Sequence, residues 1–150
     1  MLYLDTSALL KLYLKERGSA ETQRLVAGQR HPLPVWEIQQ MEFVNALRLK
    51  VFWKDLSPAD ADRQIDLFKD RRRRGLYYHP EIDRLELAEN FERLSRETVR
   101  HGGRTFDVLH VACALVLGAR QFVTFDTKQS LVACQAGLDV PEFAAPAKES

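Results

Sequence analysis

The sequence predicts an α/β protein in which a parallel sheet is covered by helices on both faces. Short apolar segments typical of buried strands alternate with longer segments that carry apolar residues at helical spacing. Parallel strands need a crossover connection, which is usually a helix, so this alternation favours a parallel sheet. The chain has 150 residues and no linker or repeat, so residues 1–143 are expected to form one domain, with a flexible tail over residues 144–150.

Composition and charge restrict the classes of function. Apolar residues make up 45% of the chain and charged residues 29%, as in ordinary globular proteins, and the net charge of +1 gives no overall attraction to polyanions. Charges interrupt every apolar run, so no membrane span is expected, and Asp5 breaks the pattern of a secretory signal. Cys113 and Cys134 lie in apolar helical segments, which predicts free, buried thiols and a cytoplasmic protein.

The first element is a strand over residues 2–4, and a helix follows it. Thr6 or Ser7 can cap this helix, because either hydroxyl can accept a hydrogen bond from a free N–H of its first turn. The leucines and the tyrosine from position 9 to 14 supply its buried side, and Gly18 is expected to end it. The next elements are a helix over residues 19–27 and a short strand within residues 31–36.

Two long helices are predicted next. The first covers residues 37–53, and Ser57 is a typical cap for the second, with Pro58 at its first position and Asp60 where a capping box carries an acid. Gly75 is expected to end this second helix. The apolar residues at helical spacing in the first are Ile38, Met41, Val44, Leu47 and Val51.

The second half of the chain continues the alternation. The segment 105–119 is the most apolar helix of the chain and is therefore expected at the centre of the fold. The glycines of "HGGR" separate it from the preceding helix. The other predicted elements are a strand at 76–79, a helix at 83–100, a strand at 121–125, a helix at 127–137 and a strand at 138–141.

Two carboxylates directly follow predicted strands. Asp5 comes after the first strand, and Asp126 comes after "QFVTF". Because sites in open parallel sheets form beyond the C-terminal ends of the strands, these two acids are expected to meet at one edge if their strands are neighbours. Each acid taken alone has a simpler interpretation as a helix cap.

Two further acids lie near the beginnings of helices, Glu42 in "QQMEFVNAL" and Asp107 in "RTFDVLHVACAL". Alone, Glu42 can be a solvated residue, and Asp107 can stabilise its helix dipole by about 0.3–1 kcal/mol. Four crowded carboxylates would repel and raise one another's pKa, which a divalent cation would relieve. Oxygen ligands without a His or Cys cluster favour Mg²⁺ or Mn²⁺, and such ions suit phosphodiester hydrolysis by an activated water.

At these stretches the sequence resembles the PIN-domain nucleases, most closely the VapC-type toxins of toxin–antitoxin pairs. The matching stretches are "LDTSALLKLYLKE", "EFVNAL", "RTFDVLHVACAL" and "FVTFD" with "GLDVP" after the next helix. Their order and spacing extend over nearly the whole chain.

The resemblance implies a three-layer α/β/α sandwich with a central parallel sheet and a Mg²⁺- or Mn²⁺-dependent endoribonuclease activity. It further implies a homodimer, an RNA substrate, and inhibition by a small antitoxin that inserts a segment into the active-site groove. The acidic, metal-binding and catalytic residues carried over are Asp5, Glu42, Asp107 and Asp126, with supporting hydroxyls at Thr6 or Ser7 and at Thr124.

One position departs from the family pattern. Many relatives carry a small hydroxyl residue before the acidic helix, whereas this chain has Trp36, followed by Glu37. Glu37 and Glu42 are five residues apart and therefore do not share a helix face. We assign Glu42 to the site because "MEFVNAL" matches the family pattern.

Several other residues have two interpretations. His110 shares a helix face with Asp107, yet a hydrogen-bonded core residue is the favoured interpretation. The basic run Arg71–Arg74 suits either a helix C-terminus, which is favoured, or contact with RNA or an antitoxin. Arg104 suits a phosphate contact or a salt bridge equally. The aromatic residues Trp36, Phe52 and Trp53 are expected in the core, with a dimer or antitoxin surface as the alternative.

Other functions remain as alternatives. A structure-specific DNA nuclease would ordinarily carry more acids and further DNA-binding segments. A phosphotransferase with Asp5 as nucleophile would need a second acid two residues later, where this chain has Ser7. A non-catalytic module that binds nucleic acid or protein would not need all four acids.

Overall fold

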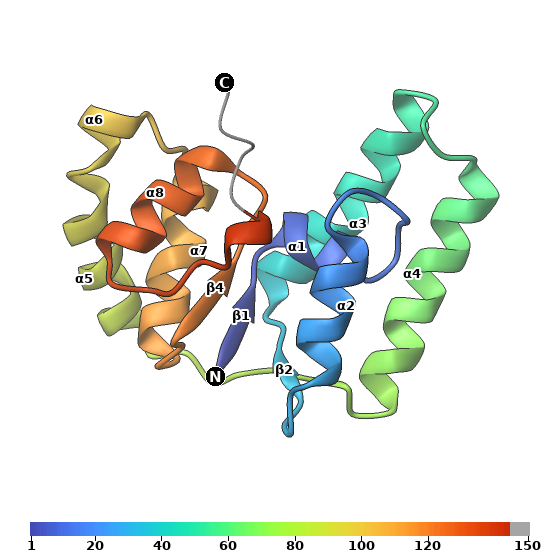
Figure 1. Cartoon of the computed structure of the whole chain (residues 1–150), viewed down its shortest axis with the longest axis horizontal. Helices are drawn as coiled ribbons and strands as arrows, with labels where there is room; N and C mark the ends of the chain where they lie inside the picture. Colours follow the sequence, from blue (N-terminus) through green and yellow to red (C-terminus); the bar gives the residue numbers. More distant parts are fainter. Residues whose placement is uncertain (145–150) are drawn as a thin grey trace.

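The computed structural model describes residues 1–144, and residues 145–150 of the expected tail lie outside the described residues. Figure 1 shows short parallel strands at the centre of the molecule with helices packed around them. The strands are β1 (Leu2–Leu4), β2 (Leu33–Pro34), β3 (Tyr77–Tyr78) and β4 (Gln121–Val123). The helices are α1 (Thr6–Leu10), α2 (Ser19–Ala27), α3 (Glu37–Phe52), α4 (Pro58–Arg73), α5 (Arg84–Ser95), α6 (Thr98–His101), α7 (Thr105–Val116), α8 (Thr127–Gln135) and the 3₁₀ helix η1 (Glu142–Ala144).

The strands pair in parallel, as predicted. Strand β1 pairs with β4, with Leu2 opposite Gln121 and Leu4 opposite Val123, and β2 pairs with β3. Strand β2 lies beside β1, so the two pairs are neighbours in one central layer (Figure 1). Asp139 adds a single parallel bridge to Gln121.

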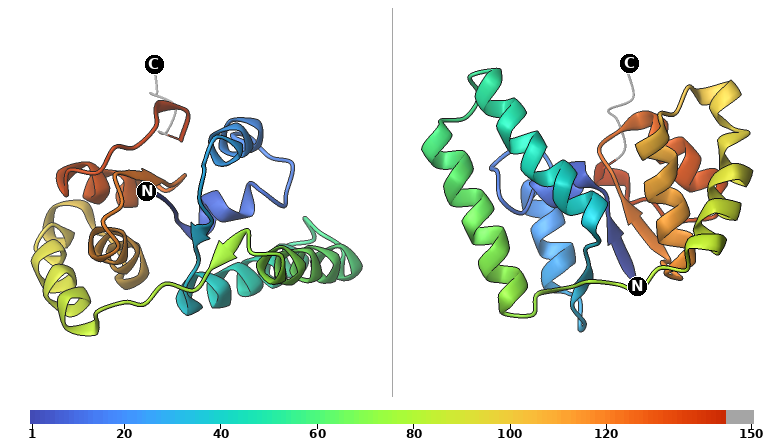
Figure 2. Two further views of the ribbon diagram at one scale, coloured as in Figure 1. Left: turned by 90° about the horizontal axis from the view of Figure 1, so that it is seen from below. Right: turned by 180° about the vertical axis from the view of Figure 1, so that it is seen from behind.

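Alternation of side chains along the strands separates two hydrophobic cores. Leu2 and Leu4 of β1 belong to a core shared with α1, α2, α3 and α4. Tyr3 points the other way and packs with Phe122 and with side chains of α5, α7 and α8. The views of Figure 2 show helices on both sides of the strands. The three-layer α/β/α sandwich is confirmed.

Helices α3 and α4 form a long hairpin that extends away from the sheet (Figure 1). The hydroxyl of Ser57 accepts a hydrogen bond from the N–H of Asp60 at 3.0 Å, and Pro58 is the first helical residue of α4. Gly75 follows the helix with φ of 79°, a conformation that other residues rarely adopt. Both predicted ends of this helix are therefore confirmed.

The first helix is shorter than predicted. Helix α1 ends at Leu10, and the chain turns so that Leu12 and Tyr13 enter the core beside α4. Gly18 does not end this helix; it precedes α2 with φ of 83°, and a side chain there would collide with the ring of Phe125. The apolar pattern up to position 14 reflects tertiary packing of the turn rather than a longer helix.

Three other predictions also need correction. The helix expected over 83–100 is divided into α5 and α6. Helix α6 has no buried residue, and its Val99 is exposed, so α6 does not continue the buried face of α5. The strand expected at 138–141 is reduced to the bridge at Asp139. Cys113 is buried and free as expected, whereas the free Cys134 is exposed because it lies on the outer side of α8.

The last described residues pack against the fold. Residues 142–144 form η1, and Phe143 packs near Phe125. Ala144, the first residue of the expected flexible tail, is only 3% exposed, so that prediction is wrong for this residue. Among the described residues, no helix is both long and apolar enough to cross a membrane.

Candidate active site

The ends of the two central strands bring Asp5 and Asp126 to the same edge of the sheet. The N–H of Asp5 donates to the carbonyl of Val123 at 3.0 Å, which continues the β1–β4 ladder to its C-terminal end. Each acid then caps the helix that follows it: Asp5 accepts from the N–H of Ala8 at 2.8 Å, and Asp126 accepts from the N–H of Gln129 at 2.9 Å. The cap of α1 is therefore Asp5 rather than Thr6 or Ser7.

Two hydroxyls connect Asp5 to the segment that carries Asp126. Ser7 Oγ donates to both carboxylate oxygens of Asp5, at 2.7 and 2.9 Å, and accepts from the N–H of Phe125 at 2.8 Å. Thr124 Oγ1 donates to Asp5 Oδ2 at 2.8 Å and accepts from the N–H of Asp126 at 3.0 Å. These bonds give the edge a defined geometry.

Asp5 is buried, with 4% of the residue exposed. Burial raises its pKa, while the nearby His110 and the bonds donated by Ala8, Ser7 and Thr124 act in the opposite direction. A buried carboxylate with this many donors is held in position but is not fully compensated in charge. A cation at this edge would therefore stabilise it.

Glu42 reaches the same part of the molecule from α3. Its carboxylate accepts from Thr6 Oγ1 at 3.2 Å and contacts His110 Nε2 at 2.9 and 3.0 Å. The side chain is 24% exposed, so part of it faces solvent. Glu37, by contrast, is exposed and lies 3.4 Å from His79. The structure therefore places Glu42, and not Glu37, beside the residues that follow β1.

Asp107 lies in the first turn of α7, with its carboxylate directed at its own helix. The N–H of Arg104 donates to Asp107 Oδ2 at 2.9 Å, which is a capping contact. The Asp107 carbonyl accepts from the amide of Gln129 at 3.1 Å. Gln129 also binds Asp126 through its backbone, so this one buried residue connects the helices that carry two of the acids.

The sequence did not predict the contacts of Gln129 with the acidic segments, or the contact of His110 with Glu42. The signal for Gln129 was its place three residues after Asp126, where a capping box carries Glu or Gln. Its Oε1 atom is buried without a hydrogen-bond partner among the described residues. His110 is 2% exposed and hydrogen-bonded to Tyr3, which confirms the interpretation as a core residue. Its second bond, to Glu42, could not be read from the sequence.

The four acids suit a divalent cation in chemistry, since all four are carboxylates. In the described residues, however, no three His, Cys, Asp or Glu side chains approach closely enough to hold an ion. The carboxylates of Asp5, Asp107 and Asp126 instead accept bonds from the N–H groups of their own helix ends. Side-chain rotation within this edge would be needed to gather them.

The basic run at the end of α4 is occupied by structural contacts. The guanidinium of Arg71 lies 4.7 Å from the centre of the Tyr13 ring and donates to the Leu12 carbonyl at 3.2 Å. Arg72 donates to the side chain of Gln40, and the last two arginines of the run pair with Asp70. The helix-terminus interpretation is favoured here as well.

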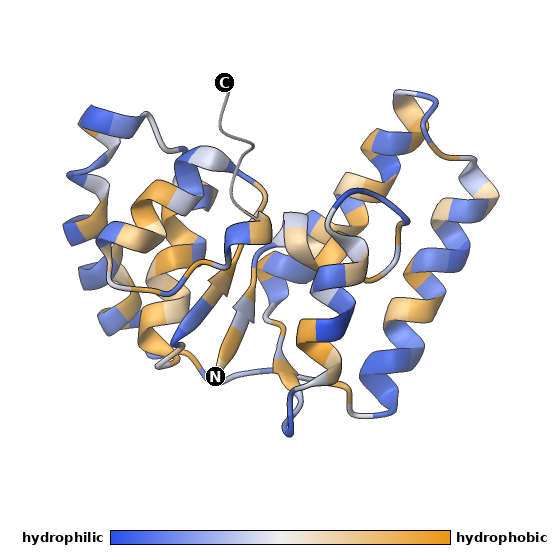
Figure 3. Cartoon of the chain, in the orientation of Figure 1, coloured by the Kyte–Doolittle hydropathy of each residue, from blue (hydrophilic) through white to orange (hydrophobic). Residues whose placement is uncertain are grey.

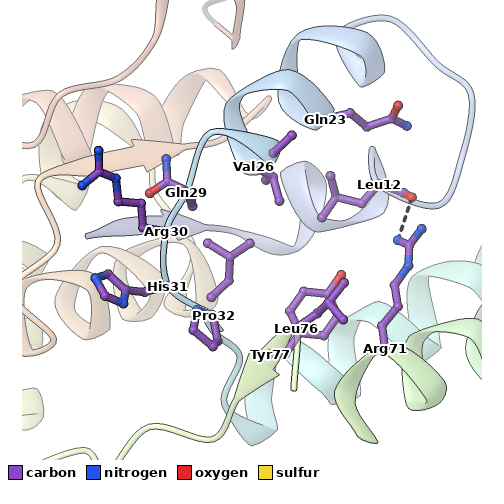
Figure 4. A pocket seen from close by; sticks show the side chains of 12 residues that line it. Leu12, Gln23, Val26, Gln29, Arg30, His31, Pro32, Arg71, Leu76 and Tyr77 are labelled. Atoms are coloured by element: carbon purple, nitrogen blue, oxygen red, sulfur yellow. Dashed lines mark hydrogen bonds between the residues drawn. The ribbon is translucent and has the colours of Figure 1, made fainter. Parts of the chain in front are cut away.

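A separate cavity of about 540 Å³ lies between α2, β3 and α4 (Figure 4). Leu12, Val26 and Tyr77 form apolar parts of its wall, and Arg71 reaches across it to Leu12. The four acids are not among its lining residues. The cavity is therefore distinct from the acidic edge, the end of the sheet where Asp5 follows β1 and Asp126 follows β4.

The predicted aromatic core is only partly correct. Trp36 is buried and packs with Tyr3 and α7, as expected. Phe52 and Trp53, at the end of α3, are 78% and 59% exposed. The hairpin of α3 and α4 extends away from the sheet (Figure 3), so none of the described elements covers its far end.

Comparisons with known proteins agree with this architecture. A structure described as FitAcB from Neisseria gonorrhoeae is similar with a TM-score of 0.65 and 15% identity, covering 95% of this chain and 98% of that chain. VapBC-1 from nontypeable Haemophilus influenzae is similar with a TM-score of 0.60 and 17% identity, with the same coverage of 95% and 98%. At these identities the likeness concerns the fold. No curated protein sequence gives a significant match.

The family comparison is more direct. The family model described as PIN domain matches residues 2–133, which include all four acids and every strand. This chain therefore belongs to the PIN-domain family.

Proposed function

We propose that this protein is a divalent-metal-dependent endoribonuclease that acts as the toxin of a toxin–antitoxin pair. The observation that carries the proposal is the hydrogen-bonded connection of Asp5 to the Asp126 segment through Thr124. It links two acids from opposite ends of the chain. Thr6 contacts Glu42, and Gln129 contacts the Asp107 carbonyl, which supports assigning these two acids to the same site. PIN-domain membership supports nuclease chemistry on such an edge.

In this proposal Asp5, Glu42, Asp107 and Asp126 hold Mg²⁺ or Mn²⁺. Such an ion, when bound, lowers the pKa of a water and polarises a phosphodiester. The chain itself supplies the positions of the ligands: Ser7 and Thr124 orient Asp5, and Thr6 orients Glu42. The exposed Arg104, next to Asp107, is available to contact a phosphate of the RNA.

The proposed partners are an antitoxin and a second copy of the chain. The structural neighbour VapBC-1 supports the VapC-type assignment, and the exposed Phe52 and Trp53 supply an apolar surface. Free thiols at Cys113 and Cys134 suit the reducing cytoplasm, where cellular RNA is found. A small protein encoded beside this one should co-purify with it and block its cleavage of RNA.

The test is cleavage of total cellular RNA by the purified chain, with Mg²⁺ or Mn²⁺ and with EDTA. Asp5→Asn is the site variant, because it keeps the shape of the side chain. Asp139→Asn is the matched control, since Asp139 lies beside the first residue of β4, at the other end of the strand from Asp126. Discrete fragments that need metal and Asp5, and that persist in the control, would support the proposal.

The alternatives predict different results in the same assay. A structure-specific DNA nuclease would cut branched or single-stranded DNA and leave RNA intact. A binding module would cut neither substrate, yet retain one in a filter-binding assay. Absence of cleavage by protein freed of any antitoxin, with all substrates offered, would contradict the endoribonuclease.

A further inference from the structure

Four side chains form a continuous line of hydrogen bonds that ends at Glu42. Trp36 Nε1 lies 3.0 Å from the Tyr3 hydroxyl, which lies 2.9 Å from His110 Nδ1, and His110 Nε2 lies 2.9 Å from Glu42 Oε1. The first three residues are buried, and Glu42 is the member that reaches solvent. We call this line the Trp36–Glu42 relay. It connects the core between the sheet and α7 to the acidic edge.

The donors and acceptors of the relay follow from the chemistry of the groups. An indole N–H can only donate, so the Tyr3 oxygen accepts from Trp36. An ionised carboxylate can only accept, so His110 Nε2 is the donor to Glu42. With the proton on Nε2, the Nδ1 atom of the imidazole can accept from the Tyr3 hydroxyl, which lies 2.9 Å away.

This arrangement gives the Glu42 carboxylate a buried hydrogen-bond donor. Among the residues that the structure describes, His110 is the one basic side chain that contacts the Glu42 carboxylate. The imidazole therefore fixes the carboxylate together with Thr6. Hydrogen bonds to carboxylate ligands orient them and tune their affinity for a metal.

We propose that Trp36, Tyr3 and His110 are positioning residues that hold Glu42 in the orientation needed to bind a divalent cation. The inference rests on the proposed function, in which Glu42 is a metal ligand. It also gives a role to Trp36, the residue at which the sequence departs from its family. The indole at this position donates to the Tyr3 hydroxyl at the buried end of the relay.

The experiment measures Mn²⁺ affinity by calorimetry and the His110 tautomer by ¹⁵N NMR of the imidazole ring. Tyr3→Phe removes a single hydroxyl and touches neither Glu42 nor the other acids. It should change the ¹⁵N signature of the His110 ring and weaken Mn²⁺ binding several-fold. His110→Phe should weaken it by about 10-fold or more, because lost bonds to metal ligands typically reduce affinity about 10–100-fold. His110→Gln should recover part of this, since its amide can accept from Tyr3 and donate to Glu42.

Phe122→Leu is the matched control. The Phe122 ring stacks on Tyr3 with centroids 5.4 Å apart, so this change disturbs the same core without removing a bond of the relay. It should lower the melting temperature and leave the tautomer and the Mn²⁺ affinity unchanged. If His110→Phe does not fold, Tyr3→Phe with this control still decides the inference.

Two results would overturn the inference while the proposed function stands. One is a wild-type His110 that carries no proton on Nε2. The other is unchanged Mn²⁺ affinity in Tyr3→Phe and His110→Phe when Glu42→Gln weakens binding. A wild-type protein that binds no Mn²⁺ would instead overturn the proposed function, and the inference with it.

Discussion

The hydroxyl of Thr124 donates to the carboxylate of Asp5 at 2.8 Å, across a sequence separation of 119 residues. The same hydroxyl accepts from the N–H of Asp126. Thr124, at the end of β4, therefore fixes the side chain of Asp5 after β1 and the backbone of Asp126 after β4. This contact adds to the pairing of β1 and β4, which are three residues long each.

Replacing Thr124 by Val keeps the volume of the side chain and removes both bonds. We expect the free energy of unfolding to fall by about 1–3 kcal/mol, because the Asp5 carboxylate and the Asp126 N–H lose a buried partner. The rate of RNA cleavage should fall by more than the loss of folded protein explains. Thr22→Val is the control: Thr22 is equally buried but bonds to the Gly18 carbonyl at 2.7 Å. Equal activity of the two variants under folding conditions would contradict this prediction.

The raised pKa of Asp5 predicts the pH dependence of stability without metal. A carboxyl group whose pKa is raised by folding contributes most below its unfolded pKa of about 3.9, and this contribution is lost as pH rises through the folded pKa. Asp5→Asn does not titrate at this position. The stability of the variant relative to the wild type should therefore increase as pH rises through the carboxylate range.

Urea denaturation in EDTA at several pH values measures this difference. The sign of this difference is diagnostic. If the variant becomes less stable relative to the wild type as pH rises, then folding lowers the pKa of Asp5, and the carboxylate is stabilised by its hydrogen-bond donors. Asp139→Asn, at an exposed acid, corrects for the effect of one fewer carboxylate.

Adding Mg²⁺ or Mn²⁺ should stabilise the wild-type protein. An ion that binds only the folded state adds about 2.7 kcal/mol at 100 times its Kd, which raises the melting temperature. Asp5→Asn and Glu42→Gln should reduce the shift, whereas Asp139→Asn should keep it. Differential scanning fluorimetry across a metal titration is sufficient. A shift that survives in both site variants would place the ion elsewhere.

A substitution at Gln129 can distinguish an effect on the stability of the fold from an effect on the position of the acids. Gln129→Met removes the amide bond to the Asp107 carbonyl and also the buried Oε1 atom that has no partner among the described residues. These two effects on stability oppose each other, so we expect the melting temperature to change little. Cleavage should fall, because the link between α7 and α8 is lost.

The control for this variant is Gln135→Met. Gln135 lies on the same helix, and its amide contacts His101 rather than an acid. RNA cleavage and thermal melting of the two variants, measured side by side, distinguish the cases. A large loss of melting temperature with retained cleavage in Gln129→Met would assign this residue a purely structural role.

The exposed end of α3 gives a prediction on assembly. Phe52→Ser with Trp53→Ser removes apolar surface that the fold does not bury, so stability should change by less than about 0.5 kcal/mol per residue. If this end forms the proposed dimer, sedimentation velocity should show a smaller species. Val99→Ser, at an equally exposed apolar residue on α6, should leave the sedimentation unchanged. A dimer that survives the double change would place its interface elsewhere.

Local sequence patterns were enough to predict the architecture and the positions of the two acids that follow strands. Asp5 and Asp126 each stand between a short apolar strand and a helix, and parallel pairing of those strands necessarily brings the two acids to one edge. Ser57, Pro58 and Gly75 defined α4 because helix caps and stops act within a few residues. In each case the interactions that decide the outcome lie within one turn or one strand of the residue itself.

Only the tertiary structure decided the features that depend on distant partners. The turn after Leu10 buries Leu12 and Tyr13 against α4, which an apolar pattern cannot distinguish from a longer helix. The bond from His110 to Glu42 spans 68 residues, and the one from Trp36 to Tyr3 spans 33. Sequence names the groups that can donate and accept, but packing of the sheet against α3 and α7 selects which of them meet.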